Sequence, residues 1–283
     1  MINNVGIIGL GLIGGSMAKT ISANTSHSVY AYNRTHKVLE EAIKEGAVCG
    51  ELDENTAANI DLLIIALYPK DVENVLNCYL PHMKKGTIIV DCTGVKGSVC
   101  KELSGPLAKK GYRFVGGHPM AGKEVAGYKN ADSTLYNRAS MILCRDEYTD
   151  EEAFLEVKDF FKEIGFPIVT ESNPLEHDQV IAFTSQLAHV ISNAYVKSPT
   201  LNKRKGFSAG SFKDLSRVAK LNEYMWTDLF LANKDALLAE IDTFIHSVSE
   251  YRDALAKEDK DKLIELLGDG RKLKELDEEN NND

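Results

Sequence analysis

The chain has 283 residues, a formal net charge of −9 and 43% hydrophobic residues. This length accommodates two domains or one large one, with sizeable hydrophobic cores. The negative charge argues against general nucleic-acid binding, which needs a basic face, but it does not exclude a small anionic substrate held by a few local cations.

Five cysteines are scattered along the chain without a CxxC pair. An odd number with no pairing pattern is typical of reduced thiols in the cytosol rather than of a disulfide framework. The N-terminus lacks the basic and apolar regions of a signal peptide, and no apolar run has the length of a membrane span. We therefore expect a cytoplasmic protein that binds neither nucleic acid nor membrane, and we expect no metal site.

Short apolar runs alternate with amphipathic stretches over the first part of the chain. The predicted strands are β-branched and apolar on successive positions, as strands buried on both faces are. They cover residues 5–9, 28–32, 62–66 and 87–91, with helical patterns between them at 13–23, 35–44 and 70–79. Repeated β-α units of this kind predict a parallel, doubly wound sheet of the Rossmann type.

Three later strand patterns, at 112–115, 140–143 and 167–170, extend the same sheet, with a helical pattern at 149–164. After Asn173-Pro174 the strand signal ends, and the rest of the chain has helical patterns, broken near 198–199 and 206–210. We therefore predict an α/β protein with a dinucleotide-binding domain at 1–172 and an all-helical second domain at 173–283.

A GxGxxG fingerprint follows the first predicted strand and opens the first predicted helix: Gly9-Leu10-Gly11-Leu12-Ile13-Gly14. The first glycine permits a tight turn, the second lets the backbone approach a pyrophosphate, and the third allows close packing of helix on strand. The helix N-terminus, with Leu12 and Ile13, offers N–H groups to phosphates. The pattern predicts a dinucleotide site; the alternative is a glycine-rich turn without a ligand.

The end of the second predicted strand bears on the choice of cofactor. NAD sites usually place an Asp or Glu there, about 20 residues beyond the fingerprint. This chain has Asn33, followed by Arg34 and Thr35. A neutral Asn does not repel a 2′-phosphate, and Arg34 can pair with one through charge-assisted hydrogen bonds. We predict a preference for NADP over NAD; the alternative is that Arg34 is solvated at a helix start.

A histidine stands among small residues after the strand pattern at 112–115, in Gly116-Gly117-His118-Pro119-Met120-Ala121-Gly122. Loops that follow strand ends are where open α/β sheets bind ligands. Histidine also has the unperturbed side-chain pKa nearest physiological pH. His118 is therefore a candidate for proton transfer beside the cofactor.

Five motifs in this order resemble those of prephenate dehydrogenases, a family that includes arogenate and cyclohexadienyl dehydrogenases. They are the fingerprint, residues 91–97 (Asp91-Cys92-Thr93-Gly94-Val95-Lys96-Gly97), residues 116–122 with Glu124, residues 185–189 (Ser185-Gln186-Leu187-Ala188-His189) and residues 212–217 (Phe212-Lys213-Asp214-Leu215-Ser216-Arg217). The resemblance covers nearly the whole chain. It implies an NAD(P)-dependent oxidoreductase of tyrosine biosynthesis that oxidatively decarboxylates prephenate or arogenate.

The resemblance also implies roles for single residues. His118 matches the catalytic histidine, which accepts a hydrogen bond from the substrate hydroxyl when neutral. Arg217 matches the arginine that binds a substrate carboxylate, and His189 matches a second histidine that faces the substrate from the helical domain. Two weaker candidates for substrate binding are Lys213 and Glu124. Without the resemblance, Arg217 would be read as a surface ion pair and His189 as a core histidine.

This chain departs from the family in one loop. The family form is Asp-x-Gly-Ser-Val-Lys, in which the serine hydroxyl reaches the substrate and the catalytic histidine. Gly94 stands in place of that serine, with Thr93 just before it. We take Thr93 as a candidate to supply the hydroxyl; a water or a backbone group is the alternative.

Members of this family pair through their helical domains, and the apolar stripes at 181–191 and 236–245 need a surface to pack on. We therefore expect a homodimer and assign residues 173–283 to substrate binding and dimerisation. Two other functions are considered. A β-hydroxyacid-type dehydrogenase shares the two-domain plan but calls for a catalytic lysine on a helix. A non-catalytic NADP-binding sensor has no need of a carboxylate clamp.

Overall fold

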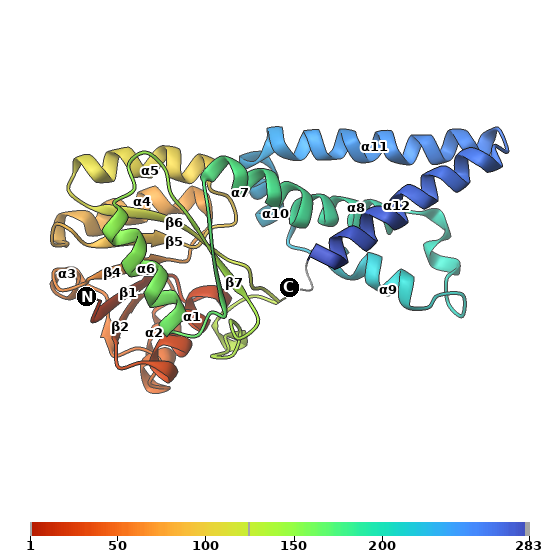
Figure 1. Ribbon diagram of the computed structural model, residues 1–283. Helices are drawn as coiled ribbons and strands as arrows, with labels where there is room; N and C mark the ends of the chain where they lie inside the picture. The colour runs from red at the N-terminus through yellow and green to blue at the C-terminus, as the bar shows by residue number, and fades with distance from the viewer. Residues whose placement is uncertain (1, 124, 281–283) are drawn as a thin grey trace. The chain divides into compact units, whose positions relative to one another are not determined.

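The computed structural model describes residues 2–123 and 125–280. Its central feature is an eight-stranded sheet in the order β3-β2-β1-β4-β5-β6-β7-β8 (Figure 1). The strands are β1 (Asn4–Ile8), β2 (Ser28–Tyr32), β3 (Gly50–Glu51), β4 (Leu62–Ile65), β5 (Ile88–Asp91), β6 (Arg113–Pro119), β7 (Ser140–Cys144) and β8 (Ile168–Ser172). This arrangement confirms the predicted doubly wound sheet.

The sheet departs from the expected parallel pattern between β6 and β7, which pair antiparallel. A parallel neighbour requires a long crossover, usually through a helix. The described part of the connection between β6 and β7 contains a short 3₁₀ turn, Tyr128–Asn130, and no α-helix, so the chain returns in the opposite direction. A helix joins β7 to β8, and these two strands are parallel.

Two layers of helices cover the sheet. The helices of this part are α1 (Leu12–Asn24), α2 (His36–Lys44), α3 (Glu54–Ala57), α4 (Pro69–Tyr79), α5 (Gly97–Lys109) and α6 (Glu151–Glu163). One core contains apolar side chains of α1, α2 and α6, and the other contains those of α3, α4 and α5. In β4, Leu62 and Ile64 belong to the first core while Leu63 and Ile65 belong to the second. This alternation explains why the strand is apolar at every position.

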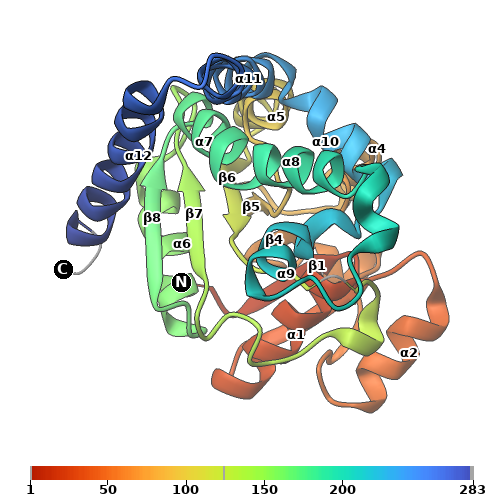
Figure 2. The same ribbon diagram turned by 90° about the vertical axis from the view of Figure 1, so that its right-hand side faces the viewer.

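After β8 the described chain is helical, as predicted (Figure 2). Its elements are α7 (Pro174–Ile181), a π-helical turn η3 (Ala182–Leu187), α8 (Ala188–Tyr195), the 3₁₀ turn η4 (Pro199–Lys203), α9 (Gly210–Ser216), the 3₁₀ turn η5 (Arg217–Ala219), α10 (Glu223–Ala232), α11 (Lys234–Ala256) and α12 (Lys260–Asn280). The chain forms two compact units, the first ending at Lys234 and the second beginning at Asp235.

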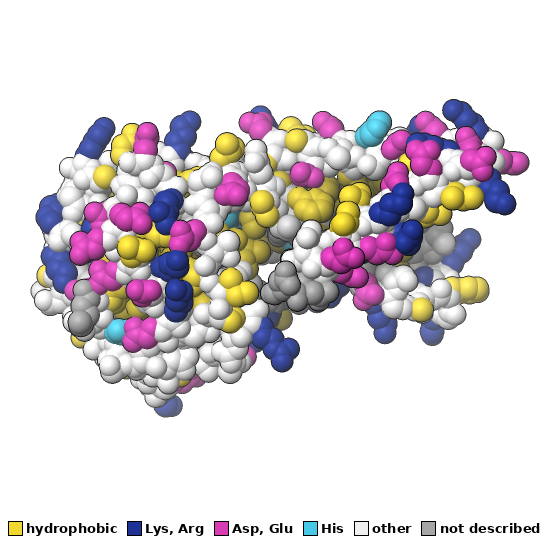
Figure 3. All heavy atoms as spheres, viewed as in Figure 1, with side chains coloured by type: hydrophobic (Ala, Val, Ile, Leu, Met, Phe, Trp, Pro, Cys, Tyr) yellow, Lys and Arg dark blue, Asp and Glu magenta, His cyan; other side chains and the backbone are white. Residues whose placement is uncertain are grey.

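The second unit contains most of α11 and all of α12, which are joined by a short turn. The Tyr251 hydroxyl donates a hydrogen bond to the Leu266 carbonyl across the two helices, at 3.1 Å. Charged side chains of both signs cover these helices (Figure 3), and Arg271 and Glu275 form one of their ion pairs, at 2.6 Å. None of the helices in the described ranges is both long and apolar enough to cross a membrane.

Candidate active site

The fingerprint glycines have two different roles in the structure. Gly9 has a φ of +96°, and a Cβ there would lie 2.6 Å from the Ala66 carbonyl oxygen. A Cβ at Gly14 would lie 1.9 Å from the Gly9 carbonyl oxygen. A Cβ at Gly11 would meet nothing within 4 Å. Gly9 and Gly14 are therefore required by the fold, whereas Gly11 borders open space.

The N-terminus of α1 suits a phosphate group. The helix begins at Leu12, Gly11 is its N-cap residue, and no side chain caps its first N–H groups. Uncapped N–H groups and the helix dipole attract anions. Together with the open space at Gly11, this end of the helix fits the pyrophosphate of a dinucleotide cofactor.

Asn33 links the end of β2 to the fingerprint. Its Oδ1 accepts a hydrogen bond from the Leu10 N–H at 3.0 Å, and its Nδ2 donates to the Thr35 carbonyl at 3.1 Å. Arg34 is exposed beside it, and Thr35 is the N-cap residue of α2. The structure thus places the three predicted cofactor residues next to the fingerprint, with the Asn33 amide engaged in holding the loop.

The sequence predicts His118 on a loop after the strand, but in the structure His118 lies within β6. The strand extends to Pro119 because its last residues pair with antiparallel β7, with His118 opposite Ile142. Along the ladders Ile8 pairs with Ile65 and Ile65 with Asp91. Asp91 pairs in turn with Gly116, two residues before His118. His118 therefore lies at the carboxyl edge of the sheet, the edge that also carries the fingerprint.

The ring of His118 is held at one nitrogen, and its other nitrogen lies near Gly94. Its Nδ1 lies 2.9 Å from Nε2 of His177. Its Nε2 would lie 3.9 Å from a Cβ added to Gly94. Burial lowers the pKa of His118 well below its ordinary value of 6.5, and the electrostatic interactions with His177 and Lys96 lower it further. His118 is therefore neutral at physiological pH.

His177 and Asp178, at the start of α7, are site residues that the sequence motifs do not predict. His177 is 2% exposed, and its Nδ1 lies 2.7 Å from Oδ1 of Asp178. Burial lowers the pKa of His177, opposed by the hydrogen bond to Asp178. The pair follows Asn173-Pro174, which we had interpreted only as the end of the strand region. An adjacent His and Asp in the first turn of a helix is a signal that could have been noticed.

A buried polar cluster fixes the loop between β5 and α5. The Lys96 ammonium and the Asp91 carboxylate form an ion pair in which both side chains are fully buried. The Gly117 N–H donates to the other Asp91 oxygen at 3.2 Å, beside His118. A buried charge pair of this kind needs such additional hydrogen bonds to offset the cost of desolvation. The cluster thus ties the loop to the strand that carries His118.

The hydroxyl of Thr93 belongs to this cluster. Its Oγ1 accepts a hydrogen bond from Lys96 Nζ at 2.9 Å and lies 2.5 Å from Asp91 Oδ2 and 2.9 Å from the Val95 carbonyl oxygen. These partners occupy the hydroxyl, so the structure does not support Thr93 as a replacement for the family serine. The space in front of His118 Nε2 is bordered instead by Gly94.

His189 projects from α8 beside a π-helical turn. Its Nδ1 donates to the Ser185 carbonyl at 2.8 Å, and its ring stacks on Trp226 with centroids 3.7 Å apart. Leu229, one turn after Trp226, is the nearest side chain to a Cβ added at Gly94, at 3.4 Å. The helix α10 therefore contacts both the ring of His189 and the loop that faces His118.

The predicted carboxylate-binding residues lie close to α8. Arg217 begins η5, which packs against α8, the helix of His189. Lys213 is exposed on α9, which also packs against α8. Glu124 lies outside the described residues. The structure thus brings the elements of Arg217, Lys213 and His189 together.

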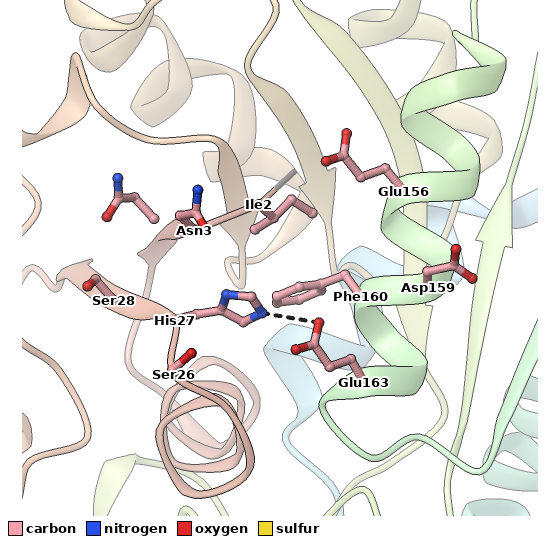
Figure 4. A pocket seen from close by; sticks show the side chains of 10 residues that line it. Ile2, Asn3, Ser26, His27, Ser28, Glu156, Asp159, Phe160 and Glu163 are labelled. Carbon is pink, nitrogen blue, oxygen red and sulfur yellow. Dashed lines mark hydrogen bonds and ion pairs between the residues drawn. The ribbon is translucent and has the colours of Figure 1, made fainter.

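A cavity of about 590 Å³ lies elsewhere on the first unit (Figure 4). It is bordered by the starts of β1 and β2 and by acidic side chains of α6, and His27 Nε2 lies 3.2 Å from Glu163 Oε2 in it. These are the amino ends of the strands, whereas open α/β sheets bind their ligands at the carboxyl ends. The cavity is therefore separate from the site of His118.

Two family models match the chain. The nucleotide-binding domain of prephenate dehydrogenase matches residues 17–170, and the dimerization domain of prephenate dehydrogenase matches residues 173–269. The chain belongs to the prephenate dehydrogenase family. It is therefore an NAD(P)-dependent oxidoreductase, as the motifs predicted.

Individual relatives agree with this membership. A cyclohexadienyl dehydrogenase of Zymomonas mobilis is 31% identical over 96% of this chain and 94% of its own length. A prephenate dehydrogenase of Bacillus subtilis is 29% identical over 91% of this chain and 71% of its own. Prephenate dehydrogenase from A. aeolicus, solved in complex with hydroxyphenyl propionate and NAD+, superposes with a TM-score of 0.86 at 27% identity, covering 98% of each chain.

The likeness to solved 3-hydroxyisobutyrate dehydrogenases is one of fold alone. The 3-hydroxyisobutyrate dehydrogenase of Mycobacterium tuberculosis is 16% identical, with a TM-score of 0.55, and the match covers 80% of this chain and 73% of that one. The prephenate dehydrogenase family accounts for more of the chain at higher identity.

Proposed function

We propose that this protein oxidatively decarboxylates prephenate or arogenate, with NADP+ preferred over NAD+ and His118 as the base. The observation that carries the proposal is a neutral imidazole at the carboxyl edge of the sheet, whose Nε2 lies 3.9 Å from the position that a Cβ would take at Gly94. A neutral imidazole can accept the proton of a substrate hydroxyl.

Hydride leaves the ring carbon that bears the hydroxyl, and a nicotinamide, when bound, accepts it. The hydroxyl proton moves to Nε2 of His118. The ring carboxylate departs as CO₂, and the electron pair of the broken bond completes the aromatic ring. His118 then returns its proton to the ring oxygen, so the residue is regenerated.

The substrate side chain carries a second carboxylate, for which Arg217 is the proposed partner. A guanidinium binds carboxylates in a bidentate manner. Lys213 is proposed to contribute to the same electrostatic task, and Glu124, which lies outside the described residues, is proposed to lie at the mouth of the active site. His189, whose Nδ1 is engaged with the Ser185 carbonyl, is proposed to face the substrate from α8.

The decisive experiment is steady-state kinetics of wild-type protein and His118→Asn with prephenate and with arogenate, followed by NADPH absorbance. We expect turnover with at least one substrate and a fall in kcat of about 10²- to 10⁴-fold in the variant, with a smaller change in KM. The matched control is His246→Asn, an exposed histidine on α11, which should leave kcat unchanged. NADP+ binding without turnover of either substrate would instead favour the sensor.

The proposed preference for NADP+ depends on Arg34, which is exposed next to the fingerprint. We expect a higher kcat/KM with NADP+ than with NAD+, because the guanidinium pairs with the 2′-phosphate. Arg34→Ala should lower kcat/KM for NADP+ and leave that for NAD+ nearly unchanged. Lys37→Ala, another exposed cation at the start of α2, is the control. A wild-type preference for NAD+ would contradict the proposal.

We also propose a homodimer formed through the helical part of the chain. The match of residues 173–269 to a dimerization domain supports this proposal. The distribution of exposed apolar side chains supports it as well, since the most exposed ones lie in the helical part.

A further inference from the structure

We infer that His177 and Asp178 are positioning residues, which hold His118 in the tautomer that leaves its Nε2 unprotonated. The inference rests on the proposed function in one respect: the proposed reaction supplies the substrate proton that Nε2 accepts. It is carried by a chain of three hydrogen-bonded side chains, His118, His177 and Asp178, that joins β6 to α7.

The chain of hydrogen bonds starts at a carboxylate held by backbone donors. Oδ1 of Asp178 accepts from the Lys96 N–H, and Oδ2 accepts from the Gly97 N–H, each at 2.7 Å. These donors lie at the N-terminus of α5, where a negative charge is stabilised by the helix dipole. The carboxylate is therefore an acceptor at both oxygens, and its orientation is fixed.

An acceptor at Asp178 determines the tautomer of His177. Nδ1 of His177 lies 2.7 Å from the same Oδ1 and must donate its proton to it. A neutral imidazole carries one proton, so Nε2 of His177 is an acceptor. Burial lowers the pKa of His177 and so favours this neutral form; the hydrogen bond to Asp178 opposes the shift, and the Lys96 ammonium adds to it.

The same reasoning determines the tautomer of His118. Its Nδ1, 2.9 Å from Nε2 of His177, must donate. The only proton of the neutral ring is then on Nδ1, and the lone pair on Nε2 points to the side of Gly94. The groups that face this pair from the neighbouring elements are Asp91 at the end of β5, Lys96 from the β5–α5 loop and Asp178 from α7.

The test separates positioning from a merely structural role by reading the tautomer directly. In wild-type protein labelled with ¹⁵N-histidine, we expect His118 to show a protonated Nδ1 and an unprotonated Nε2. His177→Leu removes the acceptor at similar size, so the ring should shift toward the Nε2-protonated form. His177→Gln keeps an acceptor oxygen near the position of Nε2 and should retain the wild-type tautomer.

Kinetics of the same variants complete the test. In His177→Leu we expect kcat to fall about 10- to 100-fold, the range found when the hydrogen-bond partner of a metal-bound histidine is removed, with KM and cofactor affinity nearly unchanged. His177→Gln should recover most of kcat. Thermal unfolding of each variant reports on folding, and if His177→Leu does not fold, the wild-type spectrum and His177→Gln still decide.

Two results would overturn the inference: a wild-type His118 protonated at Nε2, or a His177→Leu protein with the wild-type tautomer and kcat. The tautomer is measured without substrate. A protein that showed the expected tautomer but turned over neither substrate would therefore contradict the proposed function. It would leave the inference about His177 and Asp178 standing.

Discussion

Gly94 stands where the prephenate dehydrogenase family has a serine, and this difference distinguishes the active site from the family form. A Cβ at Gly94 would lie 3.4 Å from Leu229 and 3.9 Å from His118 Nε2, both ordinary contacts. Its φ is not in the left-handed region that favours glycine. A serine therefore fits here, and its hydroxyl would reach the nitrogen that receives the substrate proton.

We predict that Gly94→Ser folds with an unchanged melting temperature and binds substrate more tightly. One added neutral hydrogen bond contributes about 0.5–1.5 kcal/mol, which corresponds to a fall in KM of roughly 2- to 10-fold. Gly94→Ala is the matched control, because it fills the same space without a hydroxyl. Equal KM values for the Ser and Ala variants would show that the hydroxyl does not reach the substrate.

At this scale the sequence predicts individual residues but not their partners. His118 and the fingerprint glycines could be recognised because their neighbours in the chain are distinctive. The contact of His118 with His177 spans 59 residues, so no local pattern encodes it. The partners of Thr93 are absent from the local pattern for the same reason, since its hydroxyl contacts Lys96 and Asp91 inside the fold.

At the scale of elements, the packing of α1 on the sheet makes a testable distinction within the fingerprint. We predict that Gly14→Ala lowers the free energy of unfolding by about 1–3 kcal/mol, because its Cβ would overlap the Gly9 carbonyl. Gly11→Ala should leave that stability nearly unchanged and weaken cofactor binding, since its Cβ would enter open space where a phosphate approaches.

Denaturant unfolding and cofactor titration of the two variants measure these effects. The prediction fails if the two alanine variants lose equal stability, or if Gly11→Ala binds cofactor as tightly as the wild type. The pair thus separates the glycine that the backbone requires from the glycine that the ligand requires.

Most elements could be predicted from the chain, and the exceptions have physical reasons. The strands of the parallel core are continuous apolar runs, which hydrophobicity identifies directly. β3 has two residues, too few to form a pattern. The direction of β7 depends on the missing crossover helix before it, and direction is not a property of the strand sequence itself.

At the scale of the whole molecule, exposed apolar side chains are unevenly distributed. Among the described residues, every large hydrophobic side chain with more than 60% exposure lies after Ser172; they are Leu175, Phe183, Phe207, Tyr224, Leu231, Leu255, Leu267 and Leu273. Contiguous exposed apolar surface marks an interaction site. We take this distribution as support for pairing through the helical part.

We predict that light scattering at micromolar concentration gives twice the chain mass of 31.2 kDa. Phe183→Asp and Leu231→Asp should shift the protein toward monomer, because each places a charge among exposed apolar side chains. Ile43→Asp, an exposed apolar position on α2, should leave the mass unchanged. A monomeric wild-type protein would refute the proposed dimer.

The hydrogen bonds around Asp178 restrain the start of the helical part of the chain. Three hydrogen bonds hold the start of the helical part: two run from Lys96 and Gly97, at the start of α5, to Asp178, and one joins His118 of the sheet to His177. The Asp178 carbonyl also accepts from Asn233 Nδ2 at 2.8 Å, near the end of the first compact unit. We therefore expect the chain around residues 172 and 173, the predicted domain boundary, to be held in place by these bonds and not to act as a hinge. We expect ligand entry to proceed by motions that leave this junction closed.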